Sequence, residues 1–292
     1  SVALLGIGRE NLRIVPAGRD FRLIPAKLEK AIQADKASGK TPMAVVASAG
    51  TVNTGAIDPL PEIADIARQH NLWLHVDGAY GALAAIAAPD KFAGLELADS
   101  ISLDPHKWLF QSLDCGCLLY RDASAAQRAF SHTGDYAKSL SSDPIEGFAF
   151  FEESIELSRR FRALKLWLSL RFHGIRAFRD VIRKNMELAT RLGAAVANHP
   201  EFELLAPVEL SAVCFRHRVG EPATDEELNR HNSAILKRLV ERGRVYLSNT
   251  TVRGKFALRA CIVNHRTTEA DVDSVIPEVL AAAGARHDQT QP

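Results

Sequence analysis

The stretch that decides the fold is Ser100-Ile101-Ser102-Leu103-Asp104-Pro105-His106-Lys107-Trp108-Leu109. Residues 100–103 alternate in polarity, which predicts a short strand that ends at the Asp-Pro pair. Lys107 then follows, between a histidine and a tryptophan. A lysine amine kept from water beside an aromatic ring is a nucleophile that can form a Schiff base with an aldehyde. Because a lysine here could also end a strand and point into water, its neighbours decide between the two interpretations.

A second stretch lies about thirty residues upstream and reads Leu72-Trp73-Leu74-His75-Val76-Asp77-Gly78-Ala79-Tyr80. Its pattern predicts a buried strand that ends at an acid followed by small residues. A carboxylate at the carboxyl end of a strand can pair with a protonated pyridine nitrogen, and small residues let a flat ring approach. An Asp-Gly pair alone more often marks a turn. Together with Pro-His-Lys-Trp, however, it predicts a pyridoxal phosphate site.

The segments around these two stretches predict a mostly parallel sheet. Residues 43–48 are small and apolar, which is typical of a strand covered on both faces, and residues 61–70 predict a helix that leads to the strand ending at Asp77. Strand, helix and strand form a right-handed crossover. Further strands are predicted at residues 100–103 and 116–120. Ligands of open α/β sheets bind beyond the carboxyl ends of the strands, which is where Thr51, Asp77, Asp104 and Lys107 fall.

The rest of the chain predicts a second, smaller α+β unit. A long loop is expected at residues 132–153, and a helix at residues 159–172 stops at Gly174 before a second helix. We expect the large cofactor-binding domain to occupy residues 1–164 and the small C-terminal domain residues 165–292. Outside the first sheet, we expect strands at residues 12–16, 202–208, 212–218, 244–247 and 256–263, and helices at residues 25–37, 175–197, 225–242 and 269–283.

Composition favours a globular protein with a small-molecule ligand. The chain has 292 residues, 47% of them hydrophobic, and its 36 basic residues nearly balance its 35 acidic ones. No global field therefore attracts nucleic acid or an acidic membrane surface. No apolar run approaches the length of a membrane span, and we expect no signal peptide. The four cysteines lie in apolar runs and predict reduced core residues, so we expect a cytoplasmic protein without a metal site.

The sequence resembles the group II pyridoxal phosphate-dependent decarboxylases, the family of aromatic L-amino acid decarboxylase. The resemblance implies the fold of the pyridoxal phosphate-dependent transferases, fold type I. The family has a further N-terminal half before the point that matches Ser1. That half would supply the phosphate-binding turn and a histidine stacked on the cofactor ring. The motifs that match are Ala47 to Thr51, Leu72 to Tyr80, Ala98 to Ser100, Asp104 to Leu109, Asp114-Cys115, Arg159 to Arg162 and Leu258-Arg259.

The resemblance implies three catalytic residues. Lys107 would form the covalent link to pyridoxal 5'-phosphate, and Asp77 would keep the pyridine nitrogen protonated. The alternative for Asp77 is a cap at the end of a strand. Tyr136 matches a tyrosine on a mobile loop that protonates Cα after carbon dioxide leaves, where phenylalanine resembles members that make aldehydes. The alternative for Tyr136 is an aromatic residue on a surface loop.

Further cofactor-binding residues are implied on both sides of the ring. Thr51 would lie beside the cofactor, and Ala79 would pack on the ring face. His75 and His106 would flank the site, although each could equally be a structural histidine. Asp104 matches a position that has asparagine in animal members; an acid there accepts hydrogen bonds but repels a phosphate dianion.

The resulting expectation is a carboxy-lyase that converts an L-amino acid, of aromatic type, into an amine and carbon dioxide. Alternatives are another reaction of the same fold, such as an aminotransferase, an aldehyde synthase or a carbon-carbon lyase, and an inactive partner subunit. The resemblance implies a homodimer with shared active sites. The arginines at 159, 160 and 162 suit a solvated helix face as well as a substrate carboxylate, and we leave them out of the catalytic set.

Overall fold

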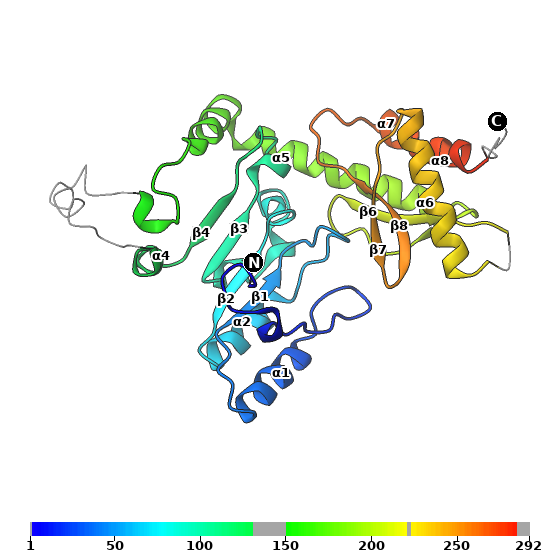
Figure 1. The fold of residues 1–292 in the computed structure, drawn as a ribbon. Coiled ribbons are helices and arrows are strands. Elements are labelled where there is room, and N and C mark those ends of the chain that lie inside the picture. Colours follow the sequence, from blue (N-terminus) through cyan, green and yellow to red (C-terminus); the bar gives the residue numbers. More distant parts are fainter. Residues whose placement is uncertain (1, 131–149, 221–222, 285–292) are drawn as a thin grey trace, which may run out of the picture.

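A computed structural model describes residues 2–130, 150–220 and 223–284 of the chain. Two sheets lie side by side, and one long helix runs past both of them (Figure 1). Tyr136 falls outside the described residues, as does the loop expected at residues 132–153 up to residue 149; residues 150–153 form a short helix rather than a loop.

The first sheet has the strand order β1-β2-β3-β4. Its strands are β1 (Ala44–Ser48), β2 (Trp73–Asp77), β3 (Ser100–Leu103) and β4 (Cys117–Tyr120). The first three are parallel, as predicted, and β4 is antiparallel to β3. The segment between β3 and β4 contains one helical turn and a loop that returns the chain beside β3, which makes the pair antiparallel.

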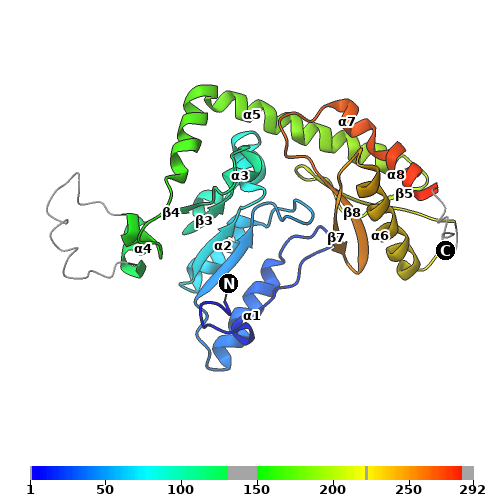
Figure 2. The same cartoon turned by 45° about the horizontal axis from the view of Figure 1, so that its top comes forward.

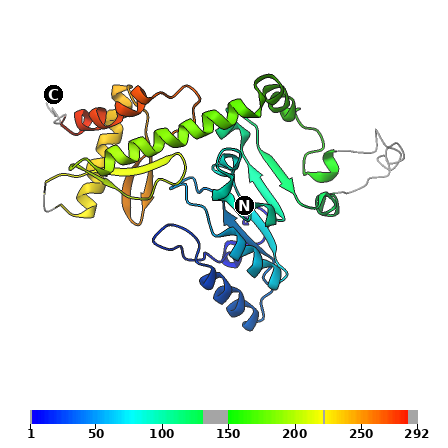
Figure 3. The same cartoon turned by 180° about the vertical axis from the view of Figure 1, so that it is seen from behind.

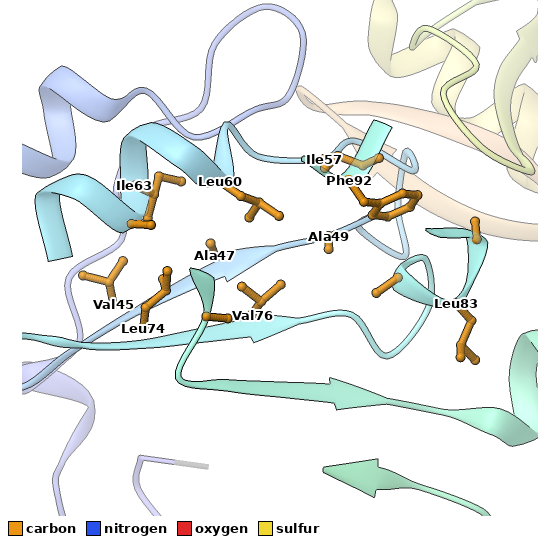
Figure 4. Packing of buried hydrophobic residues seen from close by; sticks show 14 of the residues in the cluster. Val45, Ala47, Ala49, Ile57, Leu60, Ile63, Leu74, Val76, Leu83 and Phe92 are labelled. Atoms are coloured by element: carbon orange, nitrogen blue, oxygen red, sulfur yellow. The ribbon is translucent and has the colours of Figure 1, made fainter. Parts of the chain in front are cut away.

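Helix α2 (Leu60–Gln69) covers one face of this sheet. Leu60 and Ile63 point from the helix toward Ala47 on β1 and Val76 on β2, and all four side chains are fully buried (Figure 4). Each large apolar side chain buried in this way stabilises the fold by about 1.5–3 kcal/mol. On the opposite face Val46 is 59% exposed, so the expectation that β1 is covered on both faces is wrong for the described residues.

The loops after β1 and β2 cross where two glycines meet. Gly50 has a φ of 87°, and a Cβ on it would lie 2.6 Å from Cα of Gly81. A Cβ on Gly81 would in turn lie 2.6 Å from Cα of Gly50. Only glycine permits so close an approach of two backbones, so these residues determine how closely the two strand-end loops pack.

Short helices and one longer helix complete the first half of the chain. The predicted strand at residues 12–16 is wrong: the segment is unpaired and is followed by a single bridge between Ala17 and Leu23. The helices are η1 (Arg9–Asn11), α1 (Pro25–Ala37), η2 (Ala82–Ile86), η3 (Pro89–Phe92), η4 (Leu95–Leu97), α3 (Pro105–Trp108), α4 (Ala123–Phe130) and η5 (Phe150–Glu153).

Helix α5 (Arg162–Ala197) runs from the first sheet to the second (Figure 3). Gly174 interrupts it with a φ of 75° and a ψ of 152°, which agrees with the predicted end of one helix and start of another. The helix contributes Phe178 and Ile182 to the core around the first sheet and Leu188 and Leu192 to the core around the second. It therefore joins two hydrophobic cores, while the predicted boundary between residues 164 and 165 stays a prediction.

The second sheet is antiparallel, in the order β5-β6-β8-β7. The strand expected at residues 244–247 is wrong, because the paired segment is residues 248–252. Arg253 and Gly254 have φ angles of 52° and 80°, so they form the two-residue hairpin turn that sets this register. The strands are β5 (Phe202–Leu204), β6 (Ala212–His217), β7 (Ser248–Val252) and β8 (Lys255–Cys261).

Helices α6 (Asp225–Arg242) and α8 (Val275–Gly284) pack on the second sheet together with α5, and α7 (Glu269–Asp273) contacts α5 and α8 (Figure 2). Thr224 and Thr268 cap α6 and α7 through capping boxes, at the two starts that the sequence predicts. None of the helices in the described ranges is long and apolar enough to cross a membrane. Within the same ranges, no group of three or more His, Cys, Asp or Glu residues could hold a metal ion.

Candidate active site

The carboxyl ends of the parallel strands form a row of polar residues. The register pairs Ser48 of β1 with Asp77 of β2, and Asp77 with Ser102 of β3. Neighbouring strands lie about 4.8 Å apart, so these residues present polar groups along one edge of the sheet. This is the edge at which the sequence predicts the ligand.

Asp77 is held by a tight turn at the end of β2. Its Oδ1 accepts hydrogen bonds from the hydroxyl of Ser102 at 3.3 Å and from the backbone N–H of Ala79 at 3.1 Å. A Cβ on Gly78 would lie 2.3 Å from Cβ of Ala82, so glycine is required at this position. The Asp77 carboxylate is itself exposed, which leaves it accessible to a ligand.

Thr51 lies in the loop that follows β1 at the same edge. Its Oγ1 is 3.0 Å from Oγ1 of Thr54. The second sheet holds this loop, because the thiol of Cys214 donates to the carbonyl of Asn53 at 2.9 Å and the guanidinium of Arg259 donates to the carbonyl of Val52. Burial raises the pKa of Cys214 to about 12, so its sulfur keeps the proton that it donates.

Lys107 lies in the one-turn helix α3, which begins directly after β3. Its Nζ is 2.8 Å from Oδ2 of Asp104, and its side chain is 36% exposed. The sequence favours a desolvated amine, and the described structure instead has a half-exposed ammonium paired with a carboxylate. The physical reason is that Asp104 occupies the N-cap position of α3, so the two side chains lie on the same side of a single turn.

His106 belongs to the same turn and points toward the backbone of the return loop. Its Nδ1 lies 2.9 Å from the carbonyl oxygen of Cys115, and its Nε2 lies 3.7 Å from Oδ2 of Asp104. His106 therefore helps to orient Asp104, and its predicted contact with the cofactor stays a prediction.

His75 lies two residues before Asp77 on β2, so both side chains are on the same face of the sheet. Its Nδ1 is 2.8 Å from the hydroxyl of Ser100, which also accepts a hydrogen bond from Nε1 of Trp73 at 2.9 Å. Burial lowers the pKa of His75, and the nearby Asp77 charge opposes that shift, so the neutral imidazole is favoured.

Sequence reasoning missed several polar residues that hold the site together. Ser102 binds Asp77, and the only signal for it was its place two residues before Asp104 on a strand. The buried indole of Trp108 donates to Asn185 at 3.1 Å. Asn185 lies on the buried face of α5, where its neighbours are apolar. A lone polar residue in an apolar stripe was the signal that could have found Asn185.

The arginines at the start of α5 bind Asp114 in the return loop. Both Arg160 and Arg162 donate to its carboxylate, the latter at 2.6 Å. The hydrogen bond from Arg162 is the main reason that the pKa of Asp114 lies below its usual range. These two arginines therefore act on the return loop, which supports leaving them out of the catalytic set.

A surface pocket of about 320 Å³ lies at the other edge of the sheet. Its lining includes Leu72 and Asp99, which precede β2 and β3, and Arg121, which follows the antiparallel β4. These positions are at the amino ends of the parallel strands. The pocket is therefore distinct from the site that contains Asp77 and Lys107.

The residues at the carboxyl edge fit the aldehyde and ring of pyridoxal phosphate. Lys107 offers a primary amine, and Asp77 offers an accessible carboxylate. When bound, the cofactor would supply an electron sink for the bonds at Cα of an amino acid.

Comparison with known proteins agrees with this assignment. A family model described as the pyridoxal-dependent decarboxylase conserved domain matches residues 2–218. The aromatic-L-amino-acid decarboxylase of Bacillus atrophaeus is 37% identical over 285 residues, which are 97% of this chain and 59% of that protein. The phenylacetaldehyde synthase of Petunia hybrida is 35% identical over 272 residues, which are 90% of this chain and 54% of that protein.

A solved structure is also similar over nearly the whole chain. Oryza sativa TDC with PLP and tryptamine matches with a TM-score of 0.90 at 34% identity, covering 97% of this chain and 59% of that one. The chain thus spans between 54% and 59% of the length of these three proteins.

Proposed function

The chain belongs to the pyridoxal-dependent decarboxylase family, and on that premise we propose that it removes the carboxyl group of an aromatic L-amino acid. The products are the amine and carbon dioxide, which makes the protein a carboxy-lyase. The observation that carries the proposal is the combination of Lys107 and Asp77 at the carboxyl ends of neighbouring parallel strands. The names of the relatives support an aromatic substrate, since one is an aromatic-L-amino-acid decarboxylase and another was solved with tryptamine.

In this proposal the two main residues act on opposite ends of the cofactor. Lys107 would hold the cofactor at its aldehyde group through its amine, with loss of water, and would then no longer pair with Asp104. Asp77 would accept a hydrogen bond from the ring nitrogen, and Ser102 and the N–H of Ala79 hold its carboxylate in place. A carboxylate in this position keeps the ring positively charged, which favours loss of carbon dioxide.

The remaining cofactor residues position the ring and its substituents. We propose that Thr51 and Ala79 lie against the cofactor, and that His75 supports Asp77 from the same face of β2. Asp104 acts as the carboxylate partner of Lys107 before the cofactor binds. His106 orients Asp104 through its own hydrogen bond to the return loop.

We propose Tyr136 as the acid that returns a proton to Cα after carbon dioxide leaves. It lies outside the described residues, so this role rests on the family pattern. A phenol is a suitable general acid when it is held within hydrogen-bond reach of the reacting carbon.

The Petunia relative favours a second candidate function. It is named a phenylacetaldehyde synthase and is 35% identical to this chain. A product that is an aldehyde rather than an amine would therefore place the protein with that relative. The tyrosine at position 136 favours the amine.

We further propose a homodimer with shared active sites, in the cytoplasm. Exposed apolar residues on the first half of α5, such as Trp167 and Phe172, at 57% and 84%, support a partner subunit. The four free cysteines support a reducing compartment.

Because the chain spans 54–59% of its relatives' length, we propose that residues preceding Ser1 supply the phosphate-binding turn and the stacking histidine. The boundary between a large and a small domain is proposed at residues 164 and 165.

Product analysis tests the proposed reaction. The protein is first loaded with pyridoxal phosphate. It is then incubated in separate reactions with carboxyl-labelled tryptophan, tyrosine, phenylalanine or glutamate. Labelled carbon dioxide and an equal amount of amine are expected from at least one aromatic substrate and not from glutamate. Carbon dioxide with an aldehyde would favour the second candidate. A keto acid with the label retained, or no turnover of any aromatic substrate, would refute decarboxylation.

A further inference from the structure

Trp108, the residue after Lys107, has one partner for its ring and another for its indole N–H. Its indole is fully buried. One face stacks on the ring of Tyr80, with centroids 5.7 Å apart and planes 9° apart. Its Nε1–H donates to Oδ1 of Asn185 at 3.1 Å. Both the ring and the polar edge of this side chain therefore have defined partners.

Each of those partners is anchored in the second half of the chain. Asn185 is 1% exposed, and its Nδ2 donates to the carbonyl of Asn264, just after β8, at 3.1 Å. The hydroxyl of Tyr80 lies 2.7 Å from that of Ser211, just before β6. Burial raises the pKa of Tyr80, so its phenol stays protonated and able to bind Ser211. Trp108 is thus connected to one end of the second sheet, where β6 begins and its antiparallel neighbour β8 ends.

Helix α3 needs such anchors because it cannot hold its own orientation. It comprises only Pro105–Trp108, and no side chain caps its N-terminus. A single helical turn has no intrinsic stability in water. The direction of Lys107 therefore depends on tertiary contacts of this turn, and those of the fully buried Trp108 reach the second half of the chain.

We propose that Asn185 is a positioning residue: by binding Trp108 it holds α3 in the orientation that presents Lys107 at the strand ends. This inference rests on the proposed function of Lys107. Asn185 belongs to α5, which runs past α3 in Figure 2, and its side chain binds Trp108 of that turn. Its two hydrogen bonds connect α3 to the end of the second sheet. The position of the Lys107 amine therefore depends on the position of that sheet relative to the first.

The test compares the effects of removing either end of the hydrogen bond. Asn185→Leu keeps the volume and removes the acceptor, whereas Trp108→Phe keeps the stacked ring and removes the donor. Two quantities are measured below the melting temperature: hydrogen exchange of the backbone amides in residues 105–111, and the rate at which pyridoxal phosphate becomes attached to Lys107, trapped with borohydride.

We expect each single substitution to speed local exchange roughly tenfold, because a buried group loses its hydrogen-bond partner. Capture at Lys107 should slow by roughly tenfold, as expected for a misplaced reacting group. In the double variant the second substitution should add no more than about twofold, since both remove the same bond.

A matched control separates positioning from stability. Asn232 is also a fully buried asparagine in a helix, and it binds the backbone of His217 in the second core. Asn232→Leu should lower the melting temperature and leave exchange in α3 and capture at Lys107 unchanged.

Three results would overturn the inference. One is that Asn185→Leu matches Asn232→Leu in both local readouts, which indicates a purely structural role. Another is that Asn185→Leu changes exchange in α3 and capture at Lys107 as much in the Trp108→Phe variant as in the parent protein, which would show that it does not act through Trp108. If Asn185→Leu fails to fold, Trp108→Phe alone must speed exchange in α3, and an unchanged rate overturns the inference. Absence of any adduct in the parent protein refutes the proposed function of Lys107, and exchange then decides the role of Asn185.

Discussion

The two sheets use their charged residues differently. In the second sheet Arg216 is 5% exposed in its side chain and pairs with Glu203 at 2.7 Å and with Asp225 at 2.8 Å. In the first sheet Asp77 is exposed at a strand end, and Lys107 is 36% exposed with Asp104 as its partner. A buried charge needs its opposite charges, because removal of one partner destabilises the fold, whereas accessible charges at the edge of a parallel sheet remain available to a ligand.

The sharpest test of this comparison exchanges a lysine in each sheet for alanine. Lys107→Ala should abolish the visible absorbance band that pyridoxal phosphate gives on the protein, because no amine remains to form the covalent link. Its melting temperature should change little, since the side chain is half exposed. Lys255→Ala removes a cation 3.0 Å from Glu203 in the second sheet and should leave the band intact. An intact band in Lys107→Ala would show that the first sheet's lysine is not the attachment site.

Arg216→Met probes the enclosed charges. We expect a loss of about 2 kcal/mol in the free energy of unfolding, because Glu203 loses a buried partner while Lys255 still binds it. Urea unfolding at neutral pH measures this loss. Attachment of pyridoxal phosphate to Lys107 should be unchanged below the transition. If attachment fell in parallel with stability, the two sheets would not be separable in function.

Asp77→Asn probes the accessible carboxylate. A neutral amide cannot give the charge-assisted hydrogen bond to a protonated ring nitrogen, so the affinity for pyridoxal phosphate should fall roughly tenfold. Titration followed by absorbance measures the affinity. The control is Asp99→Asn at the amino edge, where Oδ2 accepts the N–H of Leu74 at 2.7 Å. Equal losses in both variants would indicate a general effect of removing a carboxylate from the sheet.

The smallest expected effect concerns the dependence of stability on pH. Burial lowers the pKa of His217 and His231 in the second unit, whose ring nitrogens are 2.9 Å apart, and of His75 in the first sheet. Glu201 lies 3.5 Å from His217 and opposes the shift, while Arg238 adds to that of His231. The unfolded chain therefore binds protons more readily than the folded one.

The sign of this effect follows from the lowered values. Stability should be constant above about pH 7 and fall as the pH drops through 6.5, the ordinary histidine value, because each of these histidines takes up a proton more readily in the unfolded chain. Urea unfolding between pH 8 and pH 5.5 measures the slope. His231→Gln should reduce that slope, and His75→Gln should reduce it independently. Stability that rises on acidification would contradict the assigned direction.

Much of the fold followed from local patterns in the sequence. The parallel strands, helix α1, the break at Gly174 and both capped helix starts have clear signatures in spacing and residue type. The errors arose where tertiary pairing decides the outcome. Residues 12–16 have a strand-like composition without a paired neighbour, and the hairpin turn at Arg253-Gly254 places β7 after the segment that had been expected.

The candidate site was predictable in its residue types and less so in its contacts. Asp77 and Lys107 stand out because their strands end at the same edge of the sheet. The pairing of Lys107 with Asp104 depends on a single helical turn, and the bond from Trp108 to Asn185 joins residues 77 positions apart. Such contacts depend on the packed fold, so sequence spacing alone could not reveal them.

Peptide mapping tests the central claim most directly. The protein is mixed with pyridoxal phosphate, reduced with borohydride, digested and analysed by mass spectrometry. If Lys107 and Asp77 form the cofactor site, the pyridoxyl group should be found on Lys107 at saturation while the other lysines remain unmodified. Lack of modification at Lys107, or an even distribution over exposed lysines, would contradict the account.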